Sequence, residues 1–452
     1  MPEQGSQENA IPLSAEQESY LEHDDSHGAV TLAFLVQGRL DLPALRNALA
    51  AVVARHQPLR MRLTDTPEGT RQVFASAGEP LIDELPASDG AAAEKVAREL
   101  ALRHAELRAG GPGPVRTWII RWAPFEALLL VLIDPLATDT WGMSVFATEL
   151  WICYHAAATG SGPAPLKPAP RYSDHVAAQR AATWAPAQHD YWRQVAGDYC
   201  AQAGSCARPD ASGDPGQPDR SDPTFTLSPE HQHQMAAFAR AIQAPPGTVE
   251  LAGLLLAMWA CHPAPAVSVW RMHHGRDDAA LAHAVGLYHR ALPLVVPVRA
   301  EATLTEFTQD VQRRWTEALG YSDMPYSTAG MRRLIARAAG AGQGTWPEVL
   351  LVQPNVTATA RRRGPVPIGR SIKIEWRDLT VKDGSRSRGS RLRIIMTPQN
   401  TPSGRVMFSP GTIPREFAGA VLGQLERLLP LFAPQNADHL VGQLADQVLS
   451  LG

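Results

Sequence analysis

The chain has 452 residues, 44% of them apolar and 19% charged, so it is long enough for two or three domains with separate hydrophobic cores. Its 42 basic and 45 acidic residues give a net charge of −3, which argues against nucleic acid or an anionic membrane surface as a partner. The N-terminus lacks a basic start with an apolar core, and no stretch reaches the ~18 apolar residues of a membrane span. We therefore expect a cytoplasmic protein.

Strands and helices alternate in the first part of the chain. A strand rich in β-branched and aromatic residues at 28–40 precedes a helix that begins after Asp41, a suitable N-cap, with Pro43 in its first turn. The elements predicted next are a helix near 91–108, strands at 115–122 and 127–133, and a helix at about 142–157.

Two Pro/Gly-rich breaks interrupt this alternation. The segment 158–174 is predicted to be a surface connector, and the more polar segment at about 203–223 a flexible loop. Beyond them the pattern predicts helices near 229–241, 247–261, 304–319 and 412–430, and strands near 266–271, 291–298, 349–354, 371–377, 391–397 and 404–409. We therefore predict two α/β lobes, with domains at 1–178 and 179–452.

The cysteines are Cys153, Cys200, Cys206 and Cys261, and none of them forms a C-x-x-C pair. Thiolate ligands of structural zinc usually come in such pairs. The sequence therefore predicts reduced thiols and no metal site.

Six segments come in the order and approximate spacing seen in condensation domains of nonribosomal peptide synthetases. They are "IPLSAEQESY", "GRLDLPALRNALAAVVARHQPLRMRL", "TDTWGMSVFATEL", "HGRDDAALAHAVGLYHRALPL", "YSDMPYS" and "VLLVQPN". The chain resembles a free-standing member of that family, which belongs with the chloramphenicol-acetyltransferase-like acyltransferases. The resemblance implies two lobes in a V-shaped pseudo-dimer. Donor and acceptor, each tethered to a carrier protein, would enter a tunnel between the lobes from opposite faces.

The resemblance also locates the reaction centre. In the family a strand ends in His-His-x-x-x-Asp-Gly, and the corresponding stretch here is Asp134-Pro135-Leu136-Ala137-Thr138-Asp139-Thr140. The family's catalytic histidine falls on Pro135, which has no side-chain heteroatom and cannot take a proton from an attacking amine. Thr140 replaces a glycine, and its branched side chain opposes positive φ or the close approach of a ligand. Trp141 keeps the family's spacing.

Four other side chains are candidate catalytic bases. Asp134 is next to Pro135, but adjacent side chains of an extended strand point to opposite faces, and a carboxylate is a weaker base than imidazole. His273 and His274 precede a family-like Gly-Arg pair, and His289 lies in a further family-like segment, so any of them could face the tunnel. The alternative is that these three are ordinary histidines, because a chain with 15 histidines places two together by chance.

Other retained positions are interpreted as architectural. The resemblance implies that Asp139 is held by an arginine that fixes the turn, and Arg60 of the "RHQPLR" segment is the candidate partner. Buried ion pairs of this kind hold a geometry more reliably than they add stability. Tyr172 and Asp174 are interpreted as packing residues at the lobe junction.

Two classes of function remain open. The first is an enzyme that forms an amide or another bond on a carrier-tethered thioester, with positioning in place of a base. The second is a binding module that docks a carrier protein or a tailoring enzyme. Acetyl-CoA-dependent transfer ranks last, since it would need the missing histidine. No bound cofactor is expected. The sequence has no phosphopantetheine-serine context, so a substrate would arrive on the phosphopantetheine of a separate peptidyl or acyl carrier protein.

Overall fold

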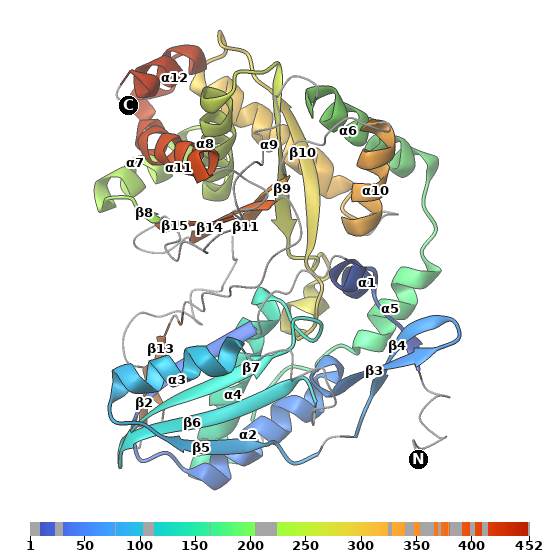
Figure 1. Ribbon diagram of the computed structural model, residues 1–452, viewed down its shortest axis with the longest axis vertical. Helices are drawn as coiled ribbons and strands as arrows, with labels where there is room; N and C mark the ends of the chain where they lie inside the picture. Colours follow the sequence, from blue (N-terminus) through green and yellow to red (C-terminus); the bar gives the residue numbers. More distant parts are fainter. Residues whose placement is uncertain are drawn as a thin grey trace.

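The computed structural model describes residues 10–22, 30–76, 78–102, 113–162, 164–203, 224–323, 328–339, 348–352, 366–368, 372–377, 379, 391–397, 403–408 and 415–450. These residues fold into two lobes, one above the other in Figure 1. Each lobe contains a six-stranded sheet with helices packed on it, so the predicted two-lobed α/β architecture is confirmed. The predicted flexible loop lies outside the described residues from position 204 onward.

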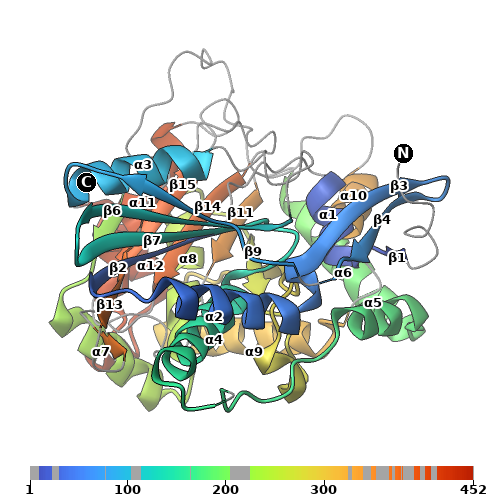
Figure 2. The ribbon, with the colours of Figure 1, turned by 90° about the horizontal axis from the view of Figure 1, so that it is seen from below.

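The first lobe is built on a sheet with the strand order β12-β13-β2-β7-β6-β5. Its strands are β2 (Val30–Gly38), β5 (Ile82–Pro86), β6 (Val115–Ala123), β7 (Glu126–Ile133), β12 (Val366–Ile368) and β13 (Ile372–Arg377). Its helices are α2 (Leu42–Arg55), α3 (Gly90–Leu102) and α4 (Thr140–Thr159), with a short 3₁₀ turn at Gln57–Arg60. Figure 2 shows α3 on one face of this sheet and α2 with α4 on the other.

Strand β7 is one of the two central strands of this sheet, and its sequence explains this position. From Ala127 to Ile133 every residue is buried. Leu129 and Val131 pack in the core that includes α2 and α4, whereas Leu128 and Leu130 pack in the core that includes α3. A strand covered on both faces reads as a continuous apolar run.

The helix that follows β2 begins as the sequence predicts. The Asp41 carboxylate accepts a hydrogen bond from the backbone N–H of Ala44 at 3.0 Å, with Pro43 in the first turn. The predicted N-cap is therefore confirmed.

The second lobe has the strand order β10-β9-β11-β14-β15-β8. Its strands are β8 (Thr224–Thr226), β9 (Ala266–His273), β10 (Arg290–Pro297), β11 (Glu348–Val352), β14 (Arg391–Thr397) and β15 (Ser403–Phe408). Its helices are α6 (Pro186–Ala203), α7 (Pro229–Ala241), α8 (Pro246–Cys261), α9 (Leu304–Gly320), α10 (Thr328–Ala339), α11 (Arg415–Leu428) and α12 (Val441–Leu449), with 3₁₀ turns at Ala279–His283, Leu429–Leu431 and Pro434–Asn436.

Smaller elements lie between the lobes. Helices α1 (Ala15–Glu22) and α5 (Tyr172–Ala181) flank the junction, and β1 (Ile11–Pro12), β3 (Met61–Thr66) and β4 (Gly69–Phe74) form a three-stranded sheet beside it. Within the described part of the chain no single helix is long and apolar enough to cross a membrane, and α7 with α8 passes that test only across a bend of 106°.

The division between the lobes is not a single cut in the sequence. Residue 178 lies inside α5, and the chain enters the second lobe between α5 and α6. Strand β13 then returns to the first lobe, where it pairs antiparallel with β2 and places Ile374 opposite Val36. The predicted domains 1–178 and 179–452 therefore place β12 and β13 in the wrong lobe, since both strands belong to the first sheet and Ile374 packs in the core of the first lobe.

Candidate active site at the lobe junction

The stretch that replaces the histidine motif forms a tight turn between β7 and α4. The backbone N–H of Ala137 donates to the carbonyl of Asp134 at 2.8 Å, and the N–H of Leu136 donates to the Asp134 carboxylate at 2.8 Å. Pro135 occupies the second position of this turn, where its fixed φ is favourable and no N–H is required. The strand is no longer extended here, so the prediction that Asp134 and Pro135 point to opposite strand faces does not apply. One carboxylate oxygen of Asp134 instead shapes the turn.

Asp139 lies at the end of this turn, 2% exposed, and caps helix α4 by accepting the N–H of Gly142 at 2.8 Å. Its carboxylate also receives both terminal nitrogens of Arg276, at 2.7 and 2.8 Å. Burial alone would raise the pKa of the Asp139 carboxyl, but Arg276 and the Gly142 N–H outweigh burial and hold this pKa below its ordinary value. The predicted burial of Asp139 in an ion pair with an arginine is confirmed.

The predicted identity of that arginine was wrong. Arg60 donates instead to the carbonyl of Ala75 and lines a cavity of about 140 Å³ within the first lobe. Arg276 belongs to the Gly-Arg pair that the sequence marks only as the neighbour of two candidate histidines. The partner comes from the second lobe because Asp139 faces across the junction.

Backbone groups strengthen this connection between the lobes. The second oxygen of Asp139 accepts the N–H groups of Tyr288 at 3.0 Å and His289 at 3.2 Å. The backbone N–H of Asp139 donates to the carbonyl of Gly286 at 3.1 Å, and Trp141 donates from its indole to the carbonyl of Ala282 at 3.0 Å. The motif turn of the first lobe is thus fastened to the segment 282–289 of the second. We call this set of contacts the Asp139 clamp.

A second polar cluster supports the first lobe beneath the clamp. His56, 1% exposed, lies 2.8 Å from the carboxylate of Glu149, and Arg55 donates to the same carboxylate at 3.0 and 3.1 Å. The other ring nitrogen of His56 accepts the backbone N–H of Val285 at 3.5 Å. Burial alone would raise the pKa of the Glu149 carboxyl, but the side-chain hydrogen bonds with His56 and Arg55 outweigh burial and lower this pKa below its ordinary value.

A third cluster joins α1 and α5 to strand β10. Buried Glu16 accepts from Gln179 at 3.1 Å and lies 3.7 Å from the guanidinium of Arg290. Burial opposes ionisation of Glu16, but these polar neighbours and His175 lower its pKa to about 2. Tyr172 is fully buried and donates to the carbonyl of Leu287 at 2.9 Å, which confirms its packing role. The same prediction for Asp174 was wrong, since its side chain is 71% exposed.

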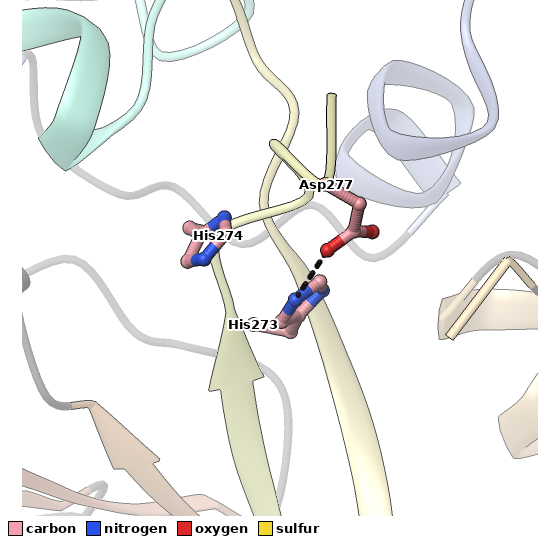
Figure 3. Close-up of side chains that lie close together, drawn as sticks. All are labelled: His273, His274 and Asp277. Carbon is pink, nitrogen blue, oxygen red and sulfur yellow. Dashed lines mark ion pairs between the residues drawn. The ribbon is translucent and has the colours of Figure 1, made fainter. Parts of the chain in front are cut away.

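His273 is the last residue of β9, and His274 follows it, two positions before Arg276 of the clamp. Figure 3 shows the two side chains with Asp277. His273 is buried, and both of its ring nitrogens are engaged. Nε2 lies 3.2 Å from the carboxylate of Asp277, and Nδ1 accepts the N–H of Gly275 at 3.3 Å. Burial lowers the pKa of His273 to about 4 despite the nearby carboxylate. These contacts make His273 a poor proton acceptor near neutral pH.

His274 is half-buried, and its Nδ1 accepts the backbone N–H of Arg276 at 2.9 Å. Its ring centroid lies 5.4 Å from that of Trp141, which belongs to the first lobe. His289 is also half-buried, with its backbone N–H bound to Asp139. The structure therefore brings His274 and the backbone of His289 into contact with Trp141 and Asp139, with His273 next to His274 along the chain, although their sequence positions alone could not establish this.

His273, His274 and Asp277 place one potential metal-ligand atom each within 4.8 Å of one another, the only such group among the residues that the structure describes. A histidine that binds a metal through one nitrogen normally carries a proton on the other, which donates to an acceptor. Here the Nδ1 atoms of His273 and His274 both accept backbone N–H groups, so each Nε2 carries the proton and is not free to bind a cation. This arrangement of protonated and accepting ring nitrogens does not suit a metal site. The expectation from the sequence that the chain has no metal site stays a prediction.

The structure thus consists of two lobes with mixed sheets, joined through the Asp139 clamp, which is the architecture that the resemblance to the chloramphenicol-acetyltransferase-like acyltransferases implies. The family model described as "Condensation domain" matches residues 7–330. The chain therefore belongs to the condensation domain family.

Individual relatives agree with this assignment. The isonitrile lipopeptide synthase of Mycobacterium tuberculosis is 27% identical over 331 residues, which is 68% of this chain. The chain spans only a small part of the curated relatives it matches, 13% of the length in this case.

Two solved structures show the same fold. SgcC5 from Streptomyces globisporus is 21% identical, with a TM-score of 0.72 over 95% of this chain and 100% of that one. The X-domain from teicoplanin biosynthesis, in its complex with OxyB, is 18% identical, with a TM-score of 0.67 over 96% of this chain and 95% of the other.

Proposed function

We propose that the chain acts in natural-product biosynthesis of the nonribosomal peptide type, on acyl or aminoacyl thioesters that carrier proteins present. In this proposal it joins a donor acyl group to an acceptor amine or hydroxyl without a histidine at position 135. The observation that carries the proposal is the Asp139 clamp. It holds the motif turn between the lobes by a buried two-point ion pair, although the base of the family motif is absent.

The chemistry of the reaction is compatible with this site. An amine nitrogen attacks the acyl carbon, the carbon–sulfur bond breaks, and the phosphopantetheine thiol leaves with a proton that originates from the amine. Well-oriented reactants reach effective molarities of about 10⁵ M or more, so holding the two tethered groups in line can replace a base. The proposed tunnel between the lobes would supply that orientation.

Carrier proteins are the proposed partners, and phosphopantetheine belongs to them. The family assignment supports this choice, as does the relative named isonitrile lipopeptide synthase. The substrate would be delivered on a separate carrier protein, and no resident cofactor is proposed for the chain.

Recruitment of a tailoring enzyme is the second candidate function. It is favoured by the proline at position 135 and by the likeness of the fold to an X-domain that forms a complex with OxyB. In this alternative the clamp would hold the two lobes together as a docking surface for other proteins, and the chain would catalyse no bond formation.

Intact-protein mass spectrometry of a loaded donor carrier and a loaded acceptor carrier tests the proposal. With the chain present, we expect the acceptor carrier to gain the mass of the donor acyl group and the donor carrier to return to its free thiol form. Reactions without the chain, and with the chain plus donor carrier alone, control for spontaneous transfer and for hydrolysis. An unchanged acceptor mass with every cognate pair, together with specific capture of a tailoring enzyme, would favour recruitment.

A further inference from the structure

The hydrogen bonds of His274 fix which of its ring nitrogens carries the proton. Nδ1 accepts the N–H of Arg276 at 2.9 Å, so it cannot itself be protonated in this arrangement. Burial lowers the pKa of His274, which favours the neutral ring. A neutral imidazole with an accepting Nδ1 presents an N–H at Nε2.

The position of this ring is tied to the clamp. Arg276, whose backbone orients His274, is held at both terminal nitrogens by Asp139, and its Nη1 also donates to the carbonyl of His274 at 3.0 Å. Gly275, between the two, has a φ of +64°. Trp141 packs beside the ring from the other lobe. His274 is therefore a rigidly placed donor.

No group in the described part of the chain accepts a hydrogen bond from Nε2 of His274, and the residue is half-buried. Its neighbour His273 differs on both counts, because its Nε2 faces Asp277 and its side chain is 5% exposed. The pair thus contains one satisfied donor and one that remains available to a ligand at the junction between the lobes (Figure 3).

We propose that His274 donates a hydrogen bond from Nε2 to the carbonyl oxygen of the bound acyl thioester, and that it acts as a donor and not as a base. This inference rests on the proposed function. As the nucleophile attacks, negative charge develops on that oxygen, and a donor already in place stabilises it without having to reorient. No proton is transferred to His274 at any step, so the missing histidine of the motif is replaced in its electrostatic role only.

The first test needs no turnover. Nitrogen-15 NMR of the full chain with labelled histidine reports the protonation of each ring nitrogen, and the signals of His274 are assigned by their loss in His274→Gln. We expect an unprotonated Nδ1 and a protonated Nε2 at neutral pH.

The same spectra then test ligand binding. The probe is an acyl pantetheine, with an acetyl or an octanoyl chain, in which a methylene replaces the thioester sulfur.

Addition of this probe should shift the Nε2–H signal of His274 downfield and leave His283, half-buried in the same connection between β9 and β10, unchanged. A proton on Nδ1, or a probe that binds without moving the Nε2–H signal, would overturn the proposal. Tight binding of Zn²⁺ that is lost in Asp277→Ala would also overturn it, because both imidazoles would then be metal ligands.

Turnover provides the second test, in which glutamine can donate from its amide but cannot take a proton. His274→Ala should lower kcat by about 10²-fold with little change in KM, the usual loss for one oxyanion donor. His274→Gln should recover most of that loss, and the control His283→Gln should match the wild type. If His274 were a base, glutamine and alanine would be equally poor, and the proposal would fail. Wild-type protein that binds the probe with the expected shift but forms no product would reject the proposed function while leaving the donor assignment in place.

Discussion

Replacing Asp139 by alanine is expected to lower the free energy of unfolding by roughly 3–5 kcal/mol, because Arg276 would remain buried without its counter-charge. The side chains of both residues are 1% exposed, so solvent cannot substitute for the lost partner. The change also removes the N-cap of α4 and two acceptors for backbone N–H groups of the second lobe. Urea unfolding followed by circular dichroism measures the loss.

The matched control is Asp134→Ala, which removes the hydrogen bond to the Leu136 N–H within the motif turn but leaves no arginine without its counter-charge, and should therefore cost less than Asp139→Ala. The double variant Asp139→Ala/Arg276→Met should lose less than the sum of its single changes, since it leaves no unpaired charge. Equal stability losses for the two aspartate variants would show that the clamp does not join the lobes as described.

Replacing Gly275 by alanine is expected to have a comparably large effect, a loss of roughly 3 kcal/mol or more. Its φ of +64° is unfavourable for a residue with a side chain, and an added Cβ would lie 2.0 Å from the carbonyl oxygen of Tyr288. Backbone cannot yield there without moving the Tyr288 N–H away from Asp139. The melting temperature and urea midpoint should both fall.

Gly197 provides the matched control. It lies in the exposed part of helix α6, and an added Cβ would meet no atom within 4 Å. Gly197→Ala should therefore stabilise the protein by about 0.5–1 kcal/mol through helix propensity. If Gly275→Ala were tolerated as well as this control, Gly275 after β9 and Tyr288 before β10 could not approach each other as closely as the structure shows.

Most of the architecture could be predicted because local patterns determine it. The run of apolar residues in β7 is typical of a strand buried on both faces, and Asp41 before a helix with proline in its first turn is a local capping signal. The return of β13 to the first sheet has no local signal. An isolated strand pattern says nothing about which sheet it joins.

The sequence identified most residues of the candidate site, but it did not identify what each of them does. Asp139 could be identified from its position in the family-like motif. The resemblance suggested Arg60 of the "RHQPLR" segment as its partner, whereas the structure pairs it with Arg276, 137 residues away in the sequence. The three histidines were found from the sequence, whereas the hydrogen bonds that fix the protonation of His273 and His274 come from the backbone N–H groups of Gly275 and Arg276 in the folded turn. Only the folded loop shows that His274 is oriented as a donor.

The most direct test of catalysis without a motif histidine is the single-turnover rate of acyl transfer between two loaded carriers, measured from about pH 6 to 9. Wild type, His273→Gln and His289→Gln should be compared in parallel. The account predicts that the rate follows deprotonation of the acceptor amine and that the two variants stay within about threefold of wild type. A single-turnover rate about 10²-fold lower in either variant, together with loss in that variant of the rate decrease that wild type shows at low pH, would identify a histidine base. This result would contradict catalysis without a histidine base.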